Sequence, residues 1–136
     1  HENAGLPGVE ALCERLRVPV AFRELALLAT RFHTHVHRAL ELRASTVLEL
    51  LEHADAFRRP ERFAQLLEAC ECDARGRTGL EQREYPQRAL LERMHAAALA
   101  ATLDDAERAA LRGPAYGEAL RRKRLAAIAA LRPAAT

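Results

Sequence analysis

The sequence predicts an all-α fold, an irregular bundle of about six or seven helices. Strong helix formers, chiefly Ala, Leu, Glu and Arg, dominate its 136 residues. Apolar residues recur at three- and four-residue spacing along most of the chain. Runs of alternating β-branched residues, which mark strands, are almost absent. Aromatic residues are only 4% of the chain, so we expect a modest core built mainly from leucine.

The first part of the chain is expected to hold two helices after an irregular start. Two glycines and a proline among residues 1–8 predict a loop there. A short helix then ends before Pro19, and a long one spans about residues 20–39. The expected buried positions of these two helices are Val9, Leu12, Cys13, Leu16, Phe22, Leu25, Leu28, Ala29, Phe32, Val36 and Leu40.

Prolines and small polar residues mark the starts of the later helices. Ser45 is the expected N-cap of one, Pro60 and Pro86 suit the first position of two others, and Asp104 or Asp105 caps a brief one. These helices are expected over about residues 45–53, 60–73, 86–102 and 104–110, with a last helix from residue 115 onward.

The charge of the chain is unevenly placed. Residues 112–136 hold six basic side chains and one acidic, whereas residues 1–111 hold 15 basic and 18 acidic. A basic tail on a mildly acidic body predicts a polyanionic or acidic partner for the tail. Four consecutive cations at 121–124 point in every direction around one helical turn. The alternative is a turn whose charges are simply solvated.

The three cysteines, Cys13, Cys70 and Cys72, show no disulfide framework, which favours buried thiols in a reducing compartment. Cys70 and Cys72 are too close together for a usual zinc pair. No membrane-spanning stretch or signal peptide is visible, so we expect a cytoplasmic protein without a membrane partner. The chain begins with His1 and not with Met, which indicates a fragment of a longer protein.

Three histidines lie close together on the long helix. Spacing of four places His33 and His37 on one face, with His35 roughly opposite. Two imidazoles one turn apart are a sound pair of ligands for a divalent metal, although further ligands must come from elsewhere. A solvated or core-facing histidine pair is the alternative interpretation.

The stretch over residues 68–79 closes one helix and opens the only long irregular segment in the middle of the chain. Its two glycines allow backbone angles closed to other residues. Arg75 and Arg77 can each present a planar fork of donors to a phosphate or a carboxylate. Alternatively, the stretch is a helix C-cap with solvated arginines, or an Asp73–Arg77 pair ties the loop down.

Five short motifs resemble those of bacterial multifunctional CCA proteins, in the same order and spacing. They are LCERLRVP at 12–19, FHTHVHR at 32–38, DAFRRP at 55–60, DARGRTG at 73–79 and YPQ at 85–87. His1-Glu2 also looks like the His-Glu that follows the His-Asp dipeptide in that family. These proteins are class II tRNA nucleotidyltransferases with an HD-type phosphohydrolase domain.

The resemblance implies a parent protein that adds or repairs the 3′-terminal CCA of tRNA. Its substrates would be CTP and ATP, and Mg²⁺ would serve a nucleotidyltransferase head absent from this chain. The HD domain would add phosphatase and phosphodiesterase activity, with nickel or another transition metal. Residues 1–79 would be the C-terminal part of that domain, and residues 80–136 a helical tail facing tRNA.

The resemblance also assigns roles to individual residues. No His-Asp dipeptide and no Gly-Ser head motif with paired aspartates is present, so we expect no catalytic residue here and an inactive fragment. Independently of the resemblance, a loop with two glycines needs an anchor to present Arg75 in a fixed direction, and Asp73 is the expected anchor of the Arg-Gly-Arg loop, with Arg77 as its partner. The expected metal ligands are His1, His33 and His37. The expected contacts to RNA phosphates are Arg75, Arg77, Arg121, Arg122, Lys123 and Arg124.

Two other functions remain open at this point. A free-standing metal-dependent phosphohydrolase is one, and the missing His-Asp dipeptide argues against it. A helical protein-interaction module without enzymatic role is the other, with its histidines and arginines only solvated. The small number of aromatic residues favours contact with a folded RNA over the reading of single-stranded bases.

Overall fold

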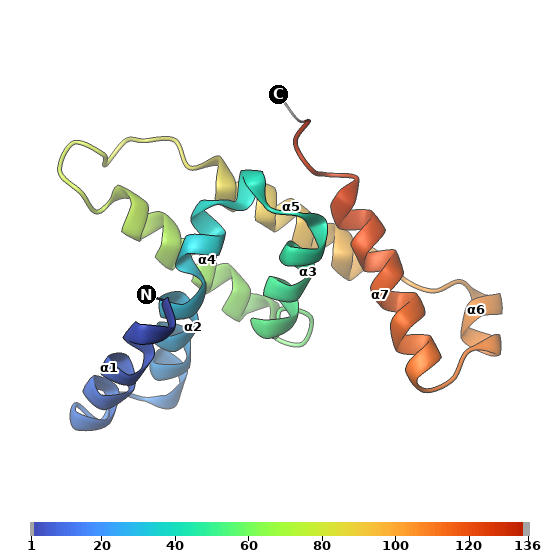
Figure 1. Ribbon diagram of the computed structural model, residues 1–136, viewed down its shortest axis with the longest axis horizontal. Coiled ribbons are helices and arrows are strands. Elements are labelled where there is room, and N and C mark those ends of the chain that lie inside the picture. Colours follow the sequence, from blue (N-terminus) through green and yellow to red (C-terminus); the bar gives the residue numbers. More distant parts are fainter. Residues whose placement is uncertain (1, 135–136) are drawn as a thin grey trace.

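The computed structural model describes residues 2–134 and shows, within them, seven α-helices, one short 3₁₀ helix and no strand (Figure 1). This confirms the all-α prediction. No helix in this range combines the length and the apolar character needed to cross a bilayer. The elements are α1 (Glu2–Arg15), α2 (Val20–His37), η1 (Ala39–Glu41), α3 (Ala44–His53), α4 (Pro60–Arg75), α5 (Pro86–Ala100), α6 (Asp105–Ala110) and α7 (Pro114–Ala129).

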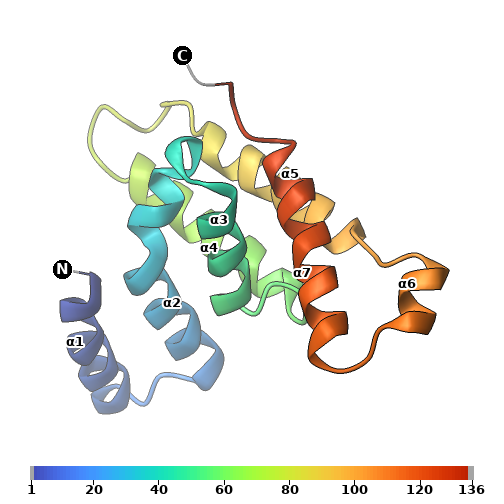
Figure 2. The same ribbon diagram turned by 45° about the vertical axis from the view of Figure 1, so that its right-hand side comes forward.

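The helices α2, α3, α4, α5 and α7 enclose one core. Figure 2 shows α3 between α2 and α7, and α2 packs against α1, α4 and α5, while α7 packs against α3 and α5. A single cluster of buried side chains runs from α2 to α7, across the expected division at residue 79. Its most enclosed members include Val36, Leu48, Leu51, Phe63, Leu66, Leu67, Leu91, Met94 and Ile128.

The starts of the later helices follow the sequence signals with one exception. Pro60, Pro86 and Pro114 each lie in the first turn of a helix, where a missing N–H costs no hydrogen bond. Asp104 caps α6 and forms a capping box with Glu107. The Ser45 prediction is wrong, because α3 begins at Ala44 without a side-chain cap.

The loop predicted for residues 1–8 is wrong from Glu2 onward, where α1 already runs; His1 lies outside the described residues. Packing against α2 overrides the local signals. At Gly5 the two helices come so close that an added Cβ would lie 3.1 Å from the methyl carbon of Thr30. Pro7 removes only one backbone donor near the start of the helix.

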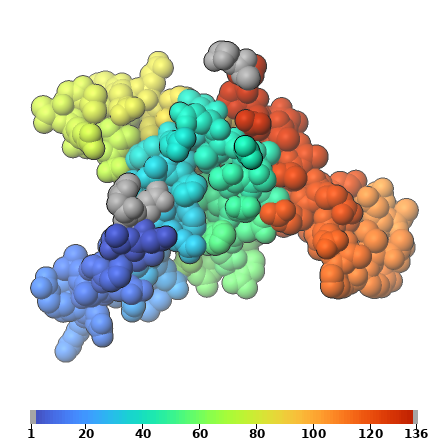
Figure 3. Space-filling view, in the orientation of Figure 1, coloured from blue at the N-terminus to red at the C-terminus, as the bar shows by residue number. Residues whose placement is uncertain are grey.

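Several apolar residues predicted to be buried are exposed. Leu12, Leu16 and Phe22 are 47%, 62% and 67% exposed, because they lie at the end of the α1–α2 hairpin that projects away from the core (Figure 3). Leu40 is also exposed. Helical spacing defines an apolar face, but the length of that face that a neighbour covers depends on packing.

The three cysteines carry free thiols, as expected. Cys13 and Cys70 are buried as predicted, but the prediction of a buried thiol is wrong for Cys72, which is exposed. Burial, with a smaller effect of the Asp73 charge, raises the pKa of the Cys70 thiol to about 12. This thiol therefore behaves as a small apolar group of the core.

Candidate functional site

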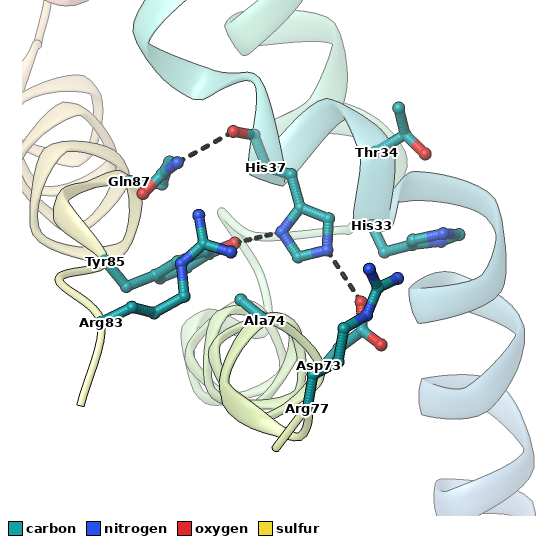
Figure 4. Close-up of a pocket in the computed structure, with 9 residues that line it drawn as sticks. All are labelled: His33, Thr34, His37, Asp73, Ala74, Arg77, Arg83, Tyr85 and Gln87. Atoms are coloured by element: carbon teal, nitrogen blue, oxygen red, sulfur yellow. Dashed lines mark hydrogen bonds and ion pairs between the residues drawn. The ribbon is translucent and has the colours of Figure 1, made fainter. Parts of the chain in front are cut away.

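A pocket of about 430 Å³ lies where the last turns of α2 and α4 meet the segment that leads into α5 (Figure 4). These parts come together because α2 packs against both α4 and α5. Side chains that are far apart in the sequence therefore share one cavity. Its lining residues are His33, Thr34, His37, Asp73, Ala74, Arg77, Arg83, Tyr85 and Gln87.

His37 lies at the centre of a hydrogen-bond network in this pocket. Its Nε2 is 2.9 Å from Oδ2 of Asp73, and its Nδ1 is 2.7 Å from the hydroxyl of Tyr85 (Figure 4). The side chain of Gln87 donates to the main-chain carbonyl of His37 at 3.0 Å. One residue of α2 is thus connected to α4 and to the start of α5.

Tyr85 is the buried member of this network, with 7% of its surface exposed. Its pKa is well above the usual range, first because the phenol is buried and then because negative groups, Asp73 among them, lie nearby. It therefore keeps its proton and remains a hydrogen-bond donor. The sequence placed Tyr85-Pro86 at a helix start but assigned the phenol no role.

The prediction that His33 and His37 face one pocket while His35 does not is confirmed. Both line the cavity, and their ring centroids are 5.9 Å apart. The Nδ1 of His33 lies 3.0 Å from the carbonyl oxygen of Ala29, which can only accept, so this nitrogen carries the proton. His35 lines a second cavity together with His53.

The carboxylate of Asp73 has a different partner from the expected one. It pairs with His37, and within residues 2–134 no ion pair joins it to Arg77. An imidazole nitrogen and a carboxylate oxygen at this separation suit one transition-metal ion, whose bonds to such ligands are about 2.0–2.2 Å long. Residues 2–134 hold no group of three ligands for a metal, and His1 lies outside them.

The side chain of Arg75 connects the loop after α4 to the rest of the fold. Its guanidinium pairs with Glu71 at 2.8 Å and donates to the main-chain oxygen of Arg83 at 3.1 Å. Gly79 adopts a φ of +88°, which the glycine expected at this turn permits. Arg75 is therefore a structural residue of the loop, and Arg77 is the loop cation that lines the pocket.

Sequence reasoning did not single out Arg83 or Thr34, although both line the pocket. Gln87 belongs to the YPQ motif at 85–87, so the resemblance could have pointed to it. Its contact with His37, however, depends on the approach of α5 to α2. Arg77 and Arg83 both line the pocket, so two cations lie beside it (Figure 4).

Most cations in the basic turn of α7 contact partners within the protein itself. Arg121 pairs with Glu52 and Lys123 with Glu107, at 3.1 and 3.2 Å. Arg124 lies over the ring of Phe57. Arg122 is exposed and forms no ion pair within residues 2–134, so it is the member of this group best placed to meet a partner.

Comparison with known proteins gives one consistent result. A multifunctional CCA protein of Xanthomonas euvesicatoria pv. vesicatoria (strain 85-10) is 55% identical over 132 residues, which is 97% of this chain. The multifunctional CCA proteins of Thioalkalivibrio sulfidiphilus (strain HL-EbGR7) and Pseudomonas paraeruginosa (strain DSM 24068 / PA7) are 51% and 52% identical over 97% and 96% of it.

This chain is a homologue of part of the multifunctional CCA proteins. The resemblance seen in its motifs is thereby confirmed over nearly its whole length. The chain spans 32% of the length of each of these relatives, so most of a multifunctional CCA protein has no counterpart here. No protein-family model matches the chain, and no solved structure matches it.

Proposed function

We propose that this chain is a segment of a multifunctional CCA protein that contributes tRNA contact and part of an HD-type phosphohydrolase site. The identity of 55% over 97% of the chain carries this proposal. The parent protein would add or repair the 3′-terminal CCA of tRNA from CTP and ATP. That chemistry would belong to a Mg²⁺-dependent head outside this chain, and the segment alone would be inactive.

The pocket is the proposed part of the phosphohydrolase site. His37 and Asp73 present a nitrogen and an oxygen 2.9 Å apart, and His33 lines the same cavity. His1, His33 and His37 would be the ligands of nickel or another divalent transition metal, which when bound polarises a phosphoryl oxygen. Arg77 and Arg83 would then offset the charge of a phosphate.

The contact with tRNA would use cations that the fold leaves available. Arg77 and Arg83 line the pocket, and Arg122 is exposed on α7. Arg75, Arg121, Lys123 and Arg124 would first have to give up partners within the protein. We keep residue 79 as the proposed boundary between the HD part and the tail, although the tail supplies pocket residues.

Titration of the chain with tRNA at several salt concentrations tests this function. Each phosphate neutralised on a duplex changes the log–log slope by roughly −0.9. The double variant Arg77→Ala/Arg83→Ala should flatten the slope by up to about two units if both are contacts. The matched control is Arg15→Ala/Arg23→Ala, two exposed cations of the α1–α2 hairpin, which should leave the slope unchanged.

One observation favours a second candidate, a helical interaction module. The ion pairs of Arg121 and Lys123 show cations of the basic tail stabilising the fold without a nucleic acid. This candidate predicts no salt-dependent affinity for tRNA. An equal loss of affinity in both double variants would also indicate general attraction between charges and not a site.

A further inference from the structure

His37 is held at three points by groups outside its own helix. Its ring nitrogens contact Tyr85 and Asp73, and its main-chain carbonyl accepts from Gln87. Two of these three contacts come from the short segment 85–87 at the start of α5. Neither Tyr85 nor Gln87 is a candidate ligand or phosphate contact, so the segment has no role in the site described so far.

The chemistry of the partners fixes the roles in this network. A carboxylate only accepts hydrogen bonds, so the Nε2 of a neutral His37 carries the proton and donates to Asp73. Its Nδ1 then holds a lone pair and accepts from the Tyr85 hydroxyl at 2.7 Å. The network is consistent with one neutral tautomer of His37, the one protonated at Nε2.

The hydroxyl of Tyr85 is also suited to the other state of the ring. If a cation takes the place of the Nε2 proton, Nδ1 becomes a donor, and the hydroxyl can turn and accept from it. A metal-bound imidazole is commonly fixed in this way by a group on its other nitrogen. A phenylalanine at this position could serve neither state.

The position of Tyr85 is rigid enough for such a role. The residue is buried, and its ring meets that of His37 edge-on, with centroids 5.8 Å apart and an interplanar angle of 85°. The following Pro86 begins α5 and fixes the backbone. Gln87, also at the start of α5, donates a hydrogen bond to the last turn of α2.

We propose that Tyr85 is a positioning residue for His37: its hydroxyl, hydrogen-bonded to Nδ1, holds the ring so that Nε2 points toward Asp73 and the pocket. The Asp73 carboxylate, which only accepts, then keeps the proton on Nε2. Gln87 assists by fixing the main chain of His37. The role of this arrangement in binding a divalent transition metal at the pocket rests on the proposed function. The orientation of the ring by Tyr85 does not depend on it.

Long-range ¹H–¹⁵N correlation of the imidazole side chains tests the proposal in the metal-free chain. At pH 8, well above the ordinary histidine pKa of about 6.5, His37 should be protonated at Nε2 and not at Nδ1. His37→Gln identifies its signals. In Tyr85→Phe the two tautomers should mix, whereas Tyr116→Phe, which alters the exposed tyrosine of α7, should change nothing.

Two results would overturn the proposal. One is a wild-type His37 protonated at Nδ1, which needs no variant and so does not depend on how well any variant folds. The other is an unchanged His37 tautomer in Tyr85→Phe.

Titration with Ni²⁺ or Co²⁺ separates this proposal from the proposed function. If the pocket binds the metal, Tyr85→Phe should weaken affinity about 10- to 100-fold and Tyr116→Phe should not. Equal affinity in wild type and Tyr85→Phe would contradict the positioning role. Absence of binding together with the expected tautomer shift would contradict only the metal part of the proposed function.

Discussion

The guanidinium carbon of Arg124 lies 3.7 Å from the ring centroid of Phe57. This contact joins α7 to the turn that follows α3. The pKa of Arg124 is lowered from its usual value because the group is partly desolvated, an effect that the Glu52 charge partly opposes. The basic turn of α7 therefore contributes to the packing of the fold as well as to its charge.

Replacement of Arg124 by Ala should destabilise the protein by about 1–2 kcal/mol, because both the cation–π contact and the packing of the side-chain stem are lost. Denaturant unfolding measures this change. Arg122→Ala is the matched control, since this exposed side chain lies two positions away, and the variant should fall within about 0.5 kcal/mol of wild type. Equal effects of the two changes would contradict the packing role.

The variant Arg121→Ala/Arg124→Ala should lower thermal stability but leave the salt dependence of tRNA binding unchanged. Arg121 pairs with Glu52 and Arg124 stacks on Phe57, so neither is available to a phosphate without loss of an internal contact. A loss of stability without a change of slope is expected from calorimetry and tRNA titration. A slope flattened by about two units would instead make both residues phosphate contacts.

Two glycines of α1 should respond differently to replacement by alanine. Gly8→Ala has open space around the new methyl group and should stabilise the protein by up to about 1 kcal/mol through helix propensity. Gly5→Ala places a Cβ 3.1 Å from the Thr30 methyl carbon. The Thr30 hydroxyl donates to Ala26 at 2.7 Å, which restricts the rotation that would relieve this contact.

Gly5→Ala should therefore be less stable than Gly8→Ala by roughly 1 kcal/mol or more, since overpacking offsets the gain in propensity. Unfolding of the two variants in parallel gives this difference directly. Equal stabilisation would mean that α1 can move away from α2 at no cost.

The cysteines should differ in reactivity toward a thiol reagent. Cys72 is exposed and should react in the native protein, whereas Cys13 and Cys70 should react only on unfolding. For Cys70 the folded pKa of about 12 exceeds the ordinary value of 9.0, so the folded state retains the proton longer than the unfolded state. Stability should therefore fall between pH 9 and 12. Cys70→Ala should show a smaller fall over this range.

The anchor of the loop after α4 can be identified by comparing Arg75→Ala with Asp73→Ala. Arg75 joins Glu71 to the main chain of Arg83, whereas the side chain of Asp73 is 64% exposed. Exposed pairs contribute about 0–1 kcal/mol, so Arg75→Ala should increase amide exchange in residues 76–84 more than Asp73→Ala does. The reverse order would restore Asp73 as the main anchor.

The sequence by itself determined the class of fold and the positions at which several helices begin. Helix-forming composition and apolar spacing gave an all-α chain. Pro60, Pro86 and Asp104 marked helix starts, because these signals act within one turn of backbone. Spacing of four also placed His33 and His37 on one face, a consequence of helix geometry alone.

Only the tertiary structure decided which of these residues meet. The Asp73 carboxylate lies 36 residues from His37 in the sequence and pairs with it because α4 packs against α2. The start of α5 brings Tyr85 and Gln87 to the same histidine. Long-range partners depend on how helices pack, and neither periodicity nor capping signals contain that information, so the pocket became visible only in the fold.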